Sequence, residues 1–280
     1  AVLAHRFPAV KNYGDIKQIE ASDLPDFDVL VGGSPCQDLS ISKQNRQGLM
    51  GAKSELFFEY IRLLRSKKPR YFVLENVASM KNDDRDFISE TLGVEPIKIN
   101  SVAFTAQHRN RYYWTNIPDV KVPESDGLSL HDCLEKEIDA KYFVNWQARK
   151  GKKIYLKGDE ITPCSLIEVR TNKGRAERKQ NKAIFGIDRN ARNKETSMYI
   201  ATNKAKTNCL TGAIHAVNLL VIRKDDELMV RMPTPIECKR FQGFPDDRTL
   251  VPRKRRMMSD TQRYKQTGNA VTVNVIAYIF

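Results

Sequence analysis

Apolar residues in the first 120 positions form short runs that alternate with helical patterns. The runs at residues 28–31 and 71–74 predict two buried parallel strands, the first of them broken by Gly32 and Gly33. Apolar residues at helical spacing predict an amphipathic helix over residues 54–66. Three more elements are predicted further on: a helix over 86–92 and strands over 96–101 and 111–115. This alternation predicts an α/β fold with a doubly wound, mostly parallel sheet.

The pattern weakens beyond about residue 120. From there to about residue 225 the chain is polar and basic with only short apolar pieces, which predicts a smaller and irregular domain. Helical patterns return at residues 235–241 and 272–280, and the second of these is apolar enough to be a buried closing helix. We therefore expect an α/β domain over 1–120, a second domain over 121–228, and a return to the first domain over 229–280.

Composition favours a soluble, cytosolic globular protein. Hydrophobic residues make up 41% of the chain and charged residues 29%, and no apolar run approaches the roughly eighteen residues of a membrane span. The N-terminal residues do not form a signal peptide. The five cysteines are odd in number and never occur as a C-x-x-C pair, which argues against a disulfide framework and against a structural zinc site. No metal site is predicted.

The net charge of +13 points to a polyanionic partner. The charge is concentrated between residues 170 and 194, which hold nine basic and only two acidic residues, and again at residues 253–256. A surface that is merely solvated would not need such concentration. Nucleic acid is therefore the predicted partner.

Chemistry-bearing residues follow the first two predicted strands. Ser34, Pro35 and Cys36 come soon after the first strand, and Glu75 and Asn76 come directly after the second. The carboxyl ends of parallel strands share one crevice, so that a thiol and a carboxyl group converge there. A nucleophile beside an acid indicates an enzyme.

Five segments follow one another in the order found in DNA (cytosine-5) methyltransferases of prokaryotic and phage type: GGSPCQDLS, ENV, QHRNR, RMPTPIECKRFQGFP and QTGNAVTVNV. The chain resembles this family from about residue 1 to 280, most weakly between 120 and 225. The resemblance implies a fold of the S-adenosylmethionine-dependent methyltransferase type with a target-recognition domain. It also implies methyl transfer to carbon 5 of a flipped cytosine in double-stranded DNA, as part of a restriction–modification or phage self-protection system in the cytoplasm of a bacterial or phage-infected cell.

The resemblance assigns catalytic roles to four residues. Cys36 is the nucleophile that attacks carbon 6 of the ring, which makes carbon 5 reactive. Glu75 is the acid that faces ring nitrogen 3. Arg111 contacts the exocyclic oxygen while Arg109 organises the site, and their spacing by two on a predicted strand would place both side chains on one face.

Further residues are matched to the cofactor and to DNA. Asp15 and Ile16 resemble the adenine-binding element, and the cofactor set is completed by Pro35, Asn269, Ala270 and Val271. A Gly-Asn turn that opens an apolar helix suits a carboxylate. Specificity is expected within residues 168–211, and the predicted DNA contacts are Gln37, Ser40, Arg170, Arg175, Arg178, Lys206, Thr207 and Thr211.

Two motifs of the resembling family are not found in this sequence. They are the strand with a Gly-rich F-x-G-x-G cofactor loop and a second strand that ends in a ribose-binding acid. The chain is therefore expected to be truncated, to be one subunit of a split enzyme, or to be a degenerate remnant. In the first two cases an N-terminal segment or a separate chain completes the cofactor site.

Two other functions stay open: a non-catalytic subunit that binds DNA, and an RNA cytosine-5 methyltransferase, although the Cys-Phe-Thr segment of the tRNA-modifying relatives is missing. The target sequence cannot be read from these residues.

Overall fold

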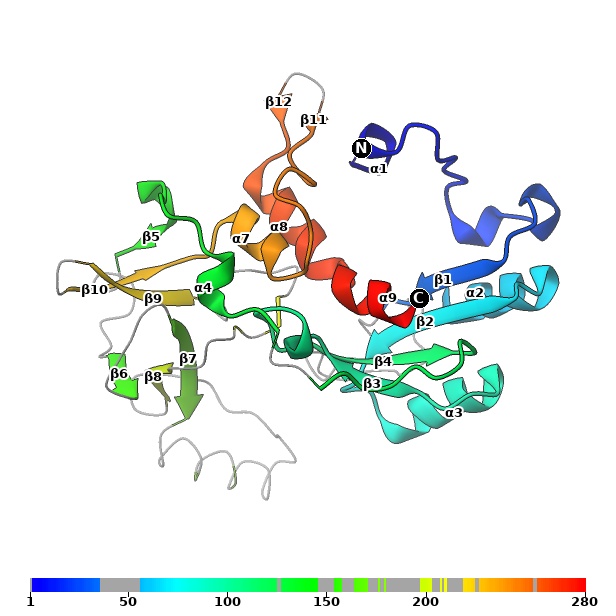
Figure 1. The fold of residues 1–280 in the computed structure, drawn as a ribbon, viewed down its shortest axis with the longest axis horizontal. Helices are drawn as coiled ribbons and strands as arrows, with labels where there is room; N and C mark the ends of the chain where they lie inside the picture. The colour runs from blue at the N-terminus through cyan, green and yellow to red at the C-terminus, as the bar shows by residue number, and fades with distance from the viewer. Residues whose placement is uncertain are drawn as a thin grey trace. The chain divides into compact units, whose positions relative to one another are not determined.

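The computed structural model describes residues 2–35, 56–124, 127–145, 154–157, 164–170, 176, 179, 197–202, 207, 209–210, 219–224, 227–253 and 256–280. The chain divides into two compact units (Figure 1). The first unit contains Ala1–Ala103, Arg109–Asp126 and Val271–Phe280, and the second contains Phe104–His108 and Gly127–Ala270.

The first unit is built on a four-stranded sheet in the order β1-β2-β4-β3. Its strands are β1 (Val29–Gly33), β2 (Tyr71–Val77), β3 (Ile97–Asn100) and β4 (Asn110–Thr115). β1 is parallel to β2, whereas β4 is antiparallel to both β2 and β3. The described sheet is therefore mixed, not mostly parallel as predicted. Residues 101–109 are too short for a parallel crossover, which needs roughly a dozen residues or more, so β4 returns antiparallel.

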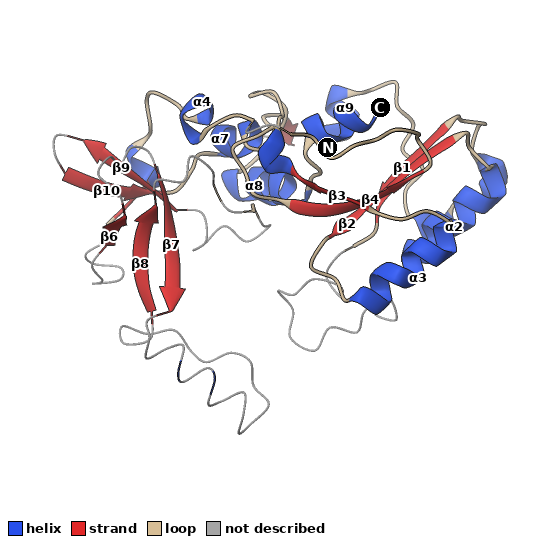
Figure 2. Cartoon of the chain, turned by 60° about the horizontal axis from the view of Figure 1, so that its bottom comes forward, coloured by secondary structure: helices blue, strands red, loops and turns tan. Residues whose placement is uncertain are grey.

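Helices α2 (Leu56–Lys67) and α3 (Asn82–Leu92) cover one side of this sheet, and α9 (Val273–Ile279) lies on the other side (Figure 2). The core under α2 and α3 is a single cluster of buried side chains: Phe57, Tyr60, Ile61, Phe72, Leu74, Val77, Met80, Ile88 and Trp114. α3 begins four residues earlier than predicted and ends, as predicted, before Gly93, which adopts the left-handed conformation with φ of 70°. Both crossover helices were thus correctly predicted in type and place.

The two strands that lead to the predicted site are longer than the sequence indicated. β1 continues through Gly32 and Gly33 instead of breaking there. Glycine is needed at position 32 because a Cβ there would lie 2.7 Å from the ring of Tyr60 on α2. β2 continues through Glu75 to Val77, because β4 pairs with it as far as Arg111. Glu75 therefore lies within a strand rather than beyond its end.

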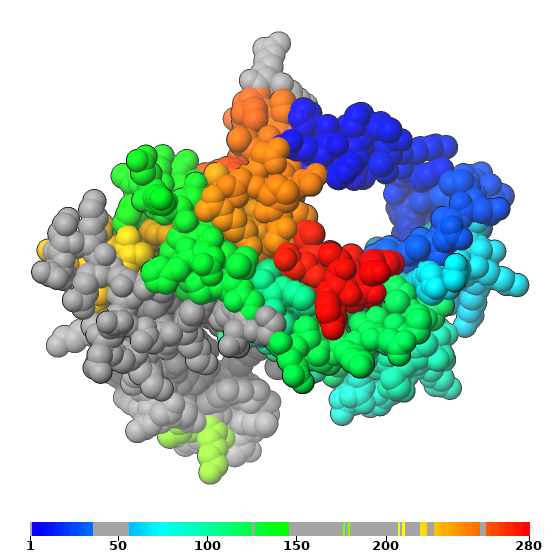
Figure 3. Space-filling model, in the orientation of Figure 1, coloured from blue at the N-terminus to red at the C-terminus, as the bar shows by residue number. Residues whose placement is uncertain are grey.

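One face of β1 is not covered by the described residues. Val29 is 38% exposed and Val31 50% exposed, although the sequence predicted a buried strand. The helix α1 (Val2–Arg6) has no buried residue, and Leu3, Phe7 and Val10 are exposed apolar side chains of the same N-terminal region. The space-filling view shows an opening between these dark-blue residues and the red helix α9, both within the first unit (Figure 3).

The second unit contains a six-stranded sheet in the order β5-β10-β9-β7-β8-β6. Its strands are β5 (Phe143–Val144), β6 (Ile154–Lys157), β7 (Cys164–Arg170), β8 (Ser197–Thr202), β9 (Leu219–Lys224) and β10 (Glu227–Arg231). All pairs are antiparallel except β6 with β8. The described part of the region predicted to be irregular thus contains a regular sheet. Its strands are short pieces of two to seven residues, which did not stand out in the polar, basic sequence around them.

Short helices and a hairpin complete the second unit: α4 (Leu130–Cys133), α7 (Pro235–Arg240), α8 (Asp260–Asn269), β11 (Pro252–Arg253) and β12 (Arg256–Met257). The predicted helix at 235–241 is α7, with Pro235 in its first turn. The core of the unit joins residues from distant parts of the sequence: Ala106, Leu130, Cys133, Tyr142, Leu210, Leu220, Cys238, Phe241 and Tyr264. No helix among the described residues is long and apolar enough to cross a membrane.

The contact between Gly32 and Tyr60 can be tested by substitution. Gly32→Ala should lower the free energy of unfolding by roughly 1–3 kcal/mol, because the new methyl group overlaps the Tyr60 ring. Denaturant unfolding measures this effect. In a Tyr60→Leu background the same substitution should cost much less, and an equal cost in both backgrounds would contradict the contact.

Candidate active site

The candidate site is assembled where β1, β2 and β4 lie side by side. The parallel register of β1 and β2 places Gly33 opposite Glu75, so that the chain leaving β1 through Ser34 and Pro35 runs next to Asn76. On the other side of β2, Glu75 pairs with Tyr113 of β4. Three strands thus deliver polar groups to one edge of the sheet.

The central contact is an ion pair between Glu75 and Arg111. Arg111 Nε lies 2.7 Å from Glu75 Oε1, and both side chains are only 13% exposed. Arg111 pairs with Val77 across the strands, so Glu75 and Arg111 are diagonal neighbours on the same face of the sheet. A charge-assisted contact of this kind holds both the carboxylate and the guanidinium in one orientation.

Close packing around Glu75 also depends on Gly33 and Tyr113. A Cβ at Gly33 would lie 3.2 Å from Glu75 Oε2, so a glycine leaves the carboxylate room. Burial, with a smaller contribution from the Glu75 charge, raises the pKa of the Tyr113 hydroxyl. Tyr113 therefore stays neutral and contributes no second negative charge beside Glu75.

Asn76 secures the segment that leaves β1. Its side chain is almost fully buried, and its Nδ2 donates to Ser34 Oγ at 2.8 Å and to Ser34 O at 3.3 Å. Its Oδ1 accepts from Val77 N at 2.8 Å. Ser34 is two positions before Cys36 in the sequence, so Asn76 positions the main chain that leads to the predicted nucleophile. Sequence reasoning used Asn76 only as part of a motif and gave it no role.

The predicted nucleophile lies outside the described residues, together with Gln37 and Ser40. The description reaches Pro35, one position before Cys36. Among the described cysteines, burial raises the pKa of the Cys238 thiol. Cys238 is therefore suited to the core and not to nucleophilic chemistry.

Arg109 is not on the strand where it was predicted. β4 begins at Asn110, and Arg109 precedes it in a turn held by Asn100, whose Oδ1 accepts from Arg109 N at 3.0 Å. Ser101 N also donates to Arg109 O. The expectation that Arg109 lies on the same strand as Arg111 is therefore wrong, because β4 begins only at Asn110. Arg109 is nevertheless buried.

Asp15 and Ile16 lie at the start of the 3-10 turn η1 (Ile16–Gln18). Asp15 is exposed and caps this turn, since its Oδ1 accepts from Lys17 N at 3.1 Å. Arg62 of α2 fixes the turn by donating to Ile16 O at 3.0 Å and to Ile19 O at 2.8 Å. An exposed carboxylate next to a partly exposed apolar side chain, on a fixed main chain, fits an adenine ring with its exocyclic amine.

The predicted turn before the last helix differs from the expectation. Asn269 is the final residue of α8, and Ala270 caps that helix, whereas α9 starts only at Val273 with Thr272 as its N-cap. The Gly-Asn pair therefore ends one helix and does not open the next. Asn269 and Ala270 belong to the second unit and Val271 to the first.

Of the predicted DNA contacts, few are described. Arg170 is the last residue of β7, but its side chain is outside the description, as are Arg175, Arg178, Lys206 and Thr211. Thr207 is described and is 1% exposed, because its main chain pairs with Ala106 and His108. A side chain in this position is not available to a base or a phosphate, which corrects the prediction for Thr207. No group of His, Cys, Asp or Glu suited to a metal ion occurs among the described residues.

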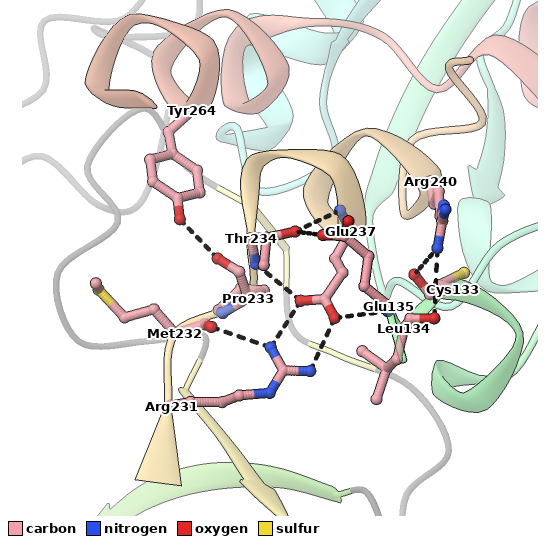
Figure 4. A network of polar contacts seen from close by, with 10 residues as sticks. All are labelled: Cys133, Leu134, Glu135, Arg231, Met232, Pro233, Thr234, Glu237, Arg240 and Tyr264. Atoms are coloured by element: carbon pink, nitrogen blue, oxygen red, sulfur yellow. Dashed lines mark hydrogen bonds and ion pairs between the residues drawn. The ribbon is translucent and has the colours of Figure 1, made fainter. Parts of the chain in front are cut away.

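A buried ion pair organises the second unit around α7 (Figure 4). Arg231 binds Glu237 through two contacts, Nη1 to Oε2 at 2.7 Å and Nη2 to Oε1 at 2.8 Å, with both side chains at most 2% exposed. Glu237 also accepts from the main chain of Thr234 and of Glu135.

Thr234 in turn contacts the Glu135 carboxylate, and Arg240 donates to the carbonyls of Cys133 and Leu134. Glu237 and Arg240 thus hold neighbouring segments together.

Removing one partner of this ion pair should be costly. Arg231→Met leaves the buried Glu237 carboxylate uncompensated and should lower the free energy of unfolding by about 3–5 kcal/mol. The exposed partner of Arg240 is a control, because Asp246→Asn should cost less than about 1 kcal/mol. Denaturant unfolding compares the two variants, and similar losses for both would contradict the scaffold role.

Comparison with known proteins identifies the family of the chain. The chain matches the family of C-5 cytosine-specific DNA methylases over residues 1–280. It is 29% identical to the type II methyltransferase M1.ScrFI of Lactococcus lactis subsp. cremoris, covering 94% of this chain and 64% of that protein. It is also 29% identical to M.SsoII of Shigella sonnei, covering 94% of this chain and 65% of that protein. The orphan methyltransferase M.SPRI of Bacillus phage SPR is 25% identical, with coverage of 99% and 87%. The chain thus spans slightly less than two thirds of the length of the first two relatives.

Solved structures show the same fold. The S. pombe Dnmt2 methyltransferase superimposes with a TM-score of 0.61 at 17% identity, covering 99% of this chain and 85% of that one. The Entamoeba histolytica methyltransferase EhMeth has a TM-score of 0.58 at 18% identity, with coverage of 100% and 85%. At these identities the likeness concerns the fold alone. The match of the family over the whole chain, together with the ion pair at the strand edge, shows that the protein belongs to the C-5 cytosine-specific DNA methylase family.

Proposed function

We propose that this chain carries the catalytic and target-recognition parts of a DNA cytosine-5 methyltransferase. The observation that carries the proposal is the ion pair of Glu75 and Arg111, formed beside the main chain that Asn76 holds two positions before Cys36. This arrangement brings an acid, a fixed cation and the approach to a thiol to one strand edge. Its biological setting is a restriction–modification or phage self-protection system in the cytoplasm of a bacterial or phage-infected cell.

In the proposed reaction the Cys36 thiolate forms a bond to carbon 6 of a flipped cytosine, and the electrons of the 5,6 double bond shift into the ring. Glu75 in its protonated form supplies a proton or a hydrogen bond to ring nitrogen 3, where negative charge develops. Arg111, held by Glu75, donates to the exocyclic oxygen. S-adenosylmethionine, when bound, supplies the methyl group that carbon 5 takes. Loss of the proton from carbon 5 then lets the thiolate leave and restores Cys36.

The cofactor would be held in part by residues of this chain. The Asp15 carboxylate would accept from the adenine amine, with Ile16 against the ring. Asn269, Ala270 and Val271 are assigned to the methionine part of the cofactor, and Pro35 is assigned to the cofactor without a specified part. Arg62 supports this binding because it fixes the turn that presents Asp15.

A segment or separate chain completes the cofactor site in this proposal. Its support is the uncovered face of β1, where Val29 and Val31 are exposed although apolar. Among the described residues β1 pairs with β2 on one side only, so its other edge is suited to pair with another strand. The curated relatives are also longer than this chain. A strand followed by a glycine-rich loop would pair with this edge and bring the missing ribose and methionine contacts.

DNA recognition is assigned to the basic part of the second unit. Lysine and arginine side chains of residues 168–211 would neutralise phosphates, and arginine and asparagine side chains would read base edges in the major groove. Arg170 stands at the end of β7, where a regular strand meets this basic stretch.

The covalent step can be trapped with DNA that contains 5-fluorocytosine. Fluorine at carbon 5 cannot leave as a proton does, so the adduct with Cys36 should survive denaturation when the chain is completed by its cofactor segment. Gel electrophoresis detects the complex, and Cys36→Ser should abolish it. If Cys36→Ser still gives a denaturation-resistant complex, another residue is the nucleophile.

The isolated 280-residue chain should bind S-adenosylmethionine weakly. The missing hydrogen bonds to ribose and methionine, at roughly 1 kcal/mol each, would weaken the affinity by orders of magnitude. Titration calorimetry on the isolated chain tests this, and adding the cofactor segment in trans should restore binding. Micromolar affinity of the isolated chain would show that no completing segment is needed.

A further inference from the structure

Gln107 is a fully buried amide that joins two distant main-chain segments. Its Nε2 donates to Phe241 O at 3.1 Å, and its Oε1 accepts from Leu210 N at 2.7 Å. The side chain is 0% exposed. Its bonds reach across 134 and 103 positions of the sequence. One side chain therefore fixes the end of α7 and the segment that contains Leu210.

The main chain around Gln107 reinforces these bonds. Thr207 N donates to Ala106 O at 2.6 Å, and His108 N donates to Thr207 O at 2.9 Å, so Gln107 and Thr207 form a parallel bridge. Ala106, Leu210 and Phe241 pack in the same hydrophobic cluster. Three segments of the second unit thus meet at Gln107: residues 106–108, residues 207–210 and the end of α7.

The place of Gln107 in the chain gives this junction its significance. Arg109 follows two positions later, and the same segment continues directly into β4 with Arg111. On the other side of the junction, Thr207 and Leu210 belong to the stretch predicted to end the recognition region. The junction therefore ties the end of that region to the segment that enters the catalytic strand.

We propose that Gln107 is a positioning residue for target recognition. This proposal rests on the proposed function. Gln107 acts by holding Thr207 and Leu210 in one position against α7 and residues 106–108. A glutamine amide suits this task because it carries a donor and an acceptor on one group, and each finds a main-chain partner. Without it, the buried Leu210 N–H and Phe241 C=O lose these partners in a site closed to water.

The chain offers a matched control in Gln242. Gln242 is also a glutamine of 0% exposure in the second unit, and its Nε2 donates to Thr267 O of α8 at 3.0 Å. This contact joins the end of α7 to α8. Methionine has nearly the same shape as glutamine but lacks both polar atoms. Gln107→Met and Gln242→Met therefore remove comparable buried hydrogen bonds at two different junctions.

The first test is amide hydrogen exchange on the full 280-residue chain. Gln107→Met should speed exchange at Leu210 and Thr207 by about tenfold or more, since the segment loses its anchor. Gln242→Met should leave both amides near their wild-type rates. Unchanged exchange at Leu210 in Gln107→Met would overturn the inference, and so would an equal increase in both variants.

The second test measures methyl transfer to duplex DNA by the chain together with its completing segment. Gln107→Met should raise KM for DNA by about tenfold and broaden the set of methylated sites, with kcat within about threefold of wild type, because Glu75 and Arg111 keep their contact. Gln242→Met at matched thermal stability should retain the wild-type KM and sites. Equal changes in both variants would reduce Gln107 to a structural role. If the wild-type protein does not methylate DNA, the proposed function fails, and the role in target recognition fails with it. Amide exchange then still decides whether Gln107 holds Thr207 and Leu210 in position.

Discussion

The site depends on one geometric constraint, the register in which β1, β2 and β4 pair around Glu75. The parallel pairing of β1 with β2 puts Gly33 opposite Glu75, and the antiparallel pairing of β4 puts Arg111 on the diagonal. Because side chains alternate between the two faces of a strand, a shift of one residue in either pair would turn the Glu75 or Arg111 side chain to the opposite face. The ion pair therefore exists only in this register.

The glycines of β1 serve this register. Gly32 lets the ring of Tyr60 pack directly on the strand, and the Tyr60 hydroxyl donates to Leu30 O at 3.3 Å, which fastens β1 to α2. Gly33 leaves space for the Glu75 carboxylate on the other face. The helix packs on one face of β1 and the Glu75 carboxylate lies on the other. Both neighbouring positions are therefore suited to glycine, which has no side chain.

The second unit is organised by buried polar groups rather than by apolar packing alone. Arg231 and Glu237 form a paired core contact, and Gln107 satisfies two main-chain segments at once. Buried polar groups are costly unless every partner is present, so they favour one arrangement of the segments over others. Such uniqueness suits the role in DNA recognition that we propose for this unit.

The sequence by itself determined the local elements and the order of the motifs. Apolar spacing was sufficient for α2, α3 and the strands up to Leu74, since a helix or strand reports its own period, and motif order identified the family that the comparisons confirm.

Tertiary structure decided everything that depends on partners distant in sequence. The antiparallel insertion of β4, the extension of β2 through Glu75, the turn that removes Arg109 from the strand and the burial of Thr207 each follow from pairing with another segment. The regular sheet of the second unit also escaped prediction, because its strands are too short to be recognised without the neighbours they pair with. Periodicity reports which face of an element is apolar, whereas register and contacts across more than a hundred positions are set only when the chain has folded.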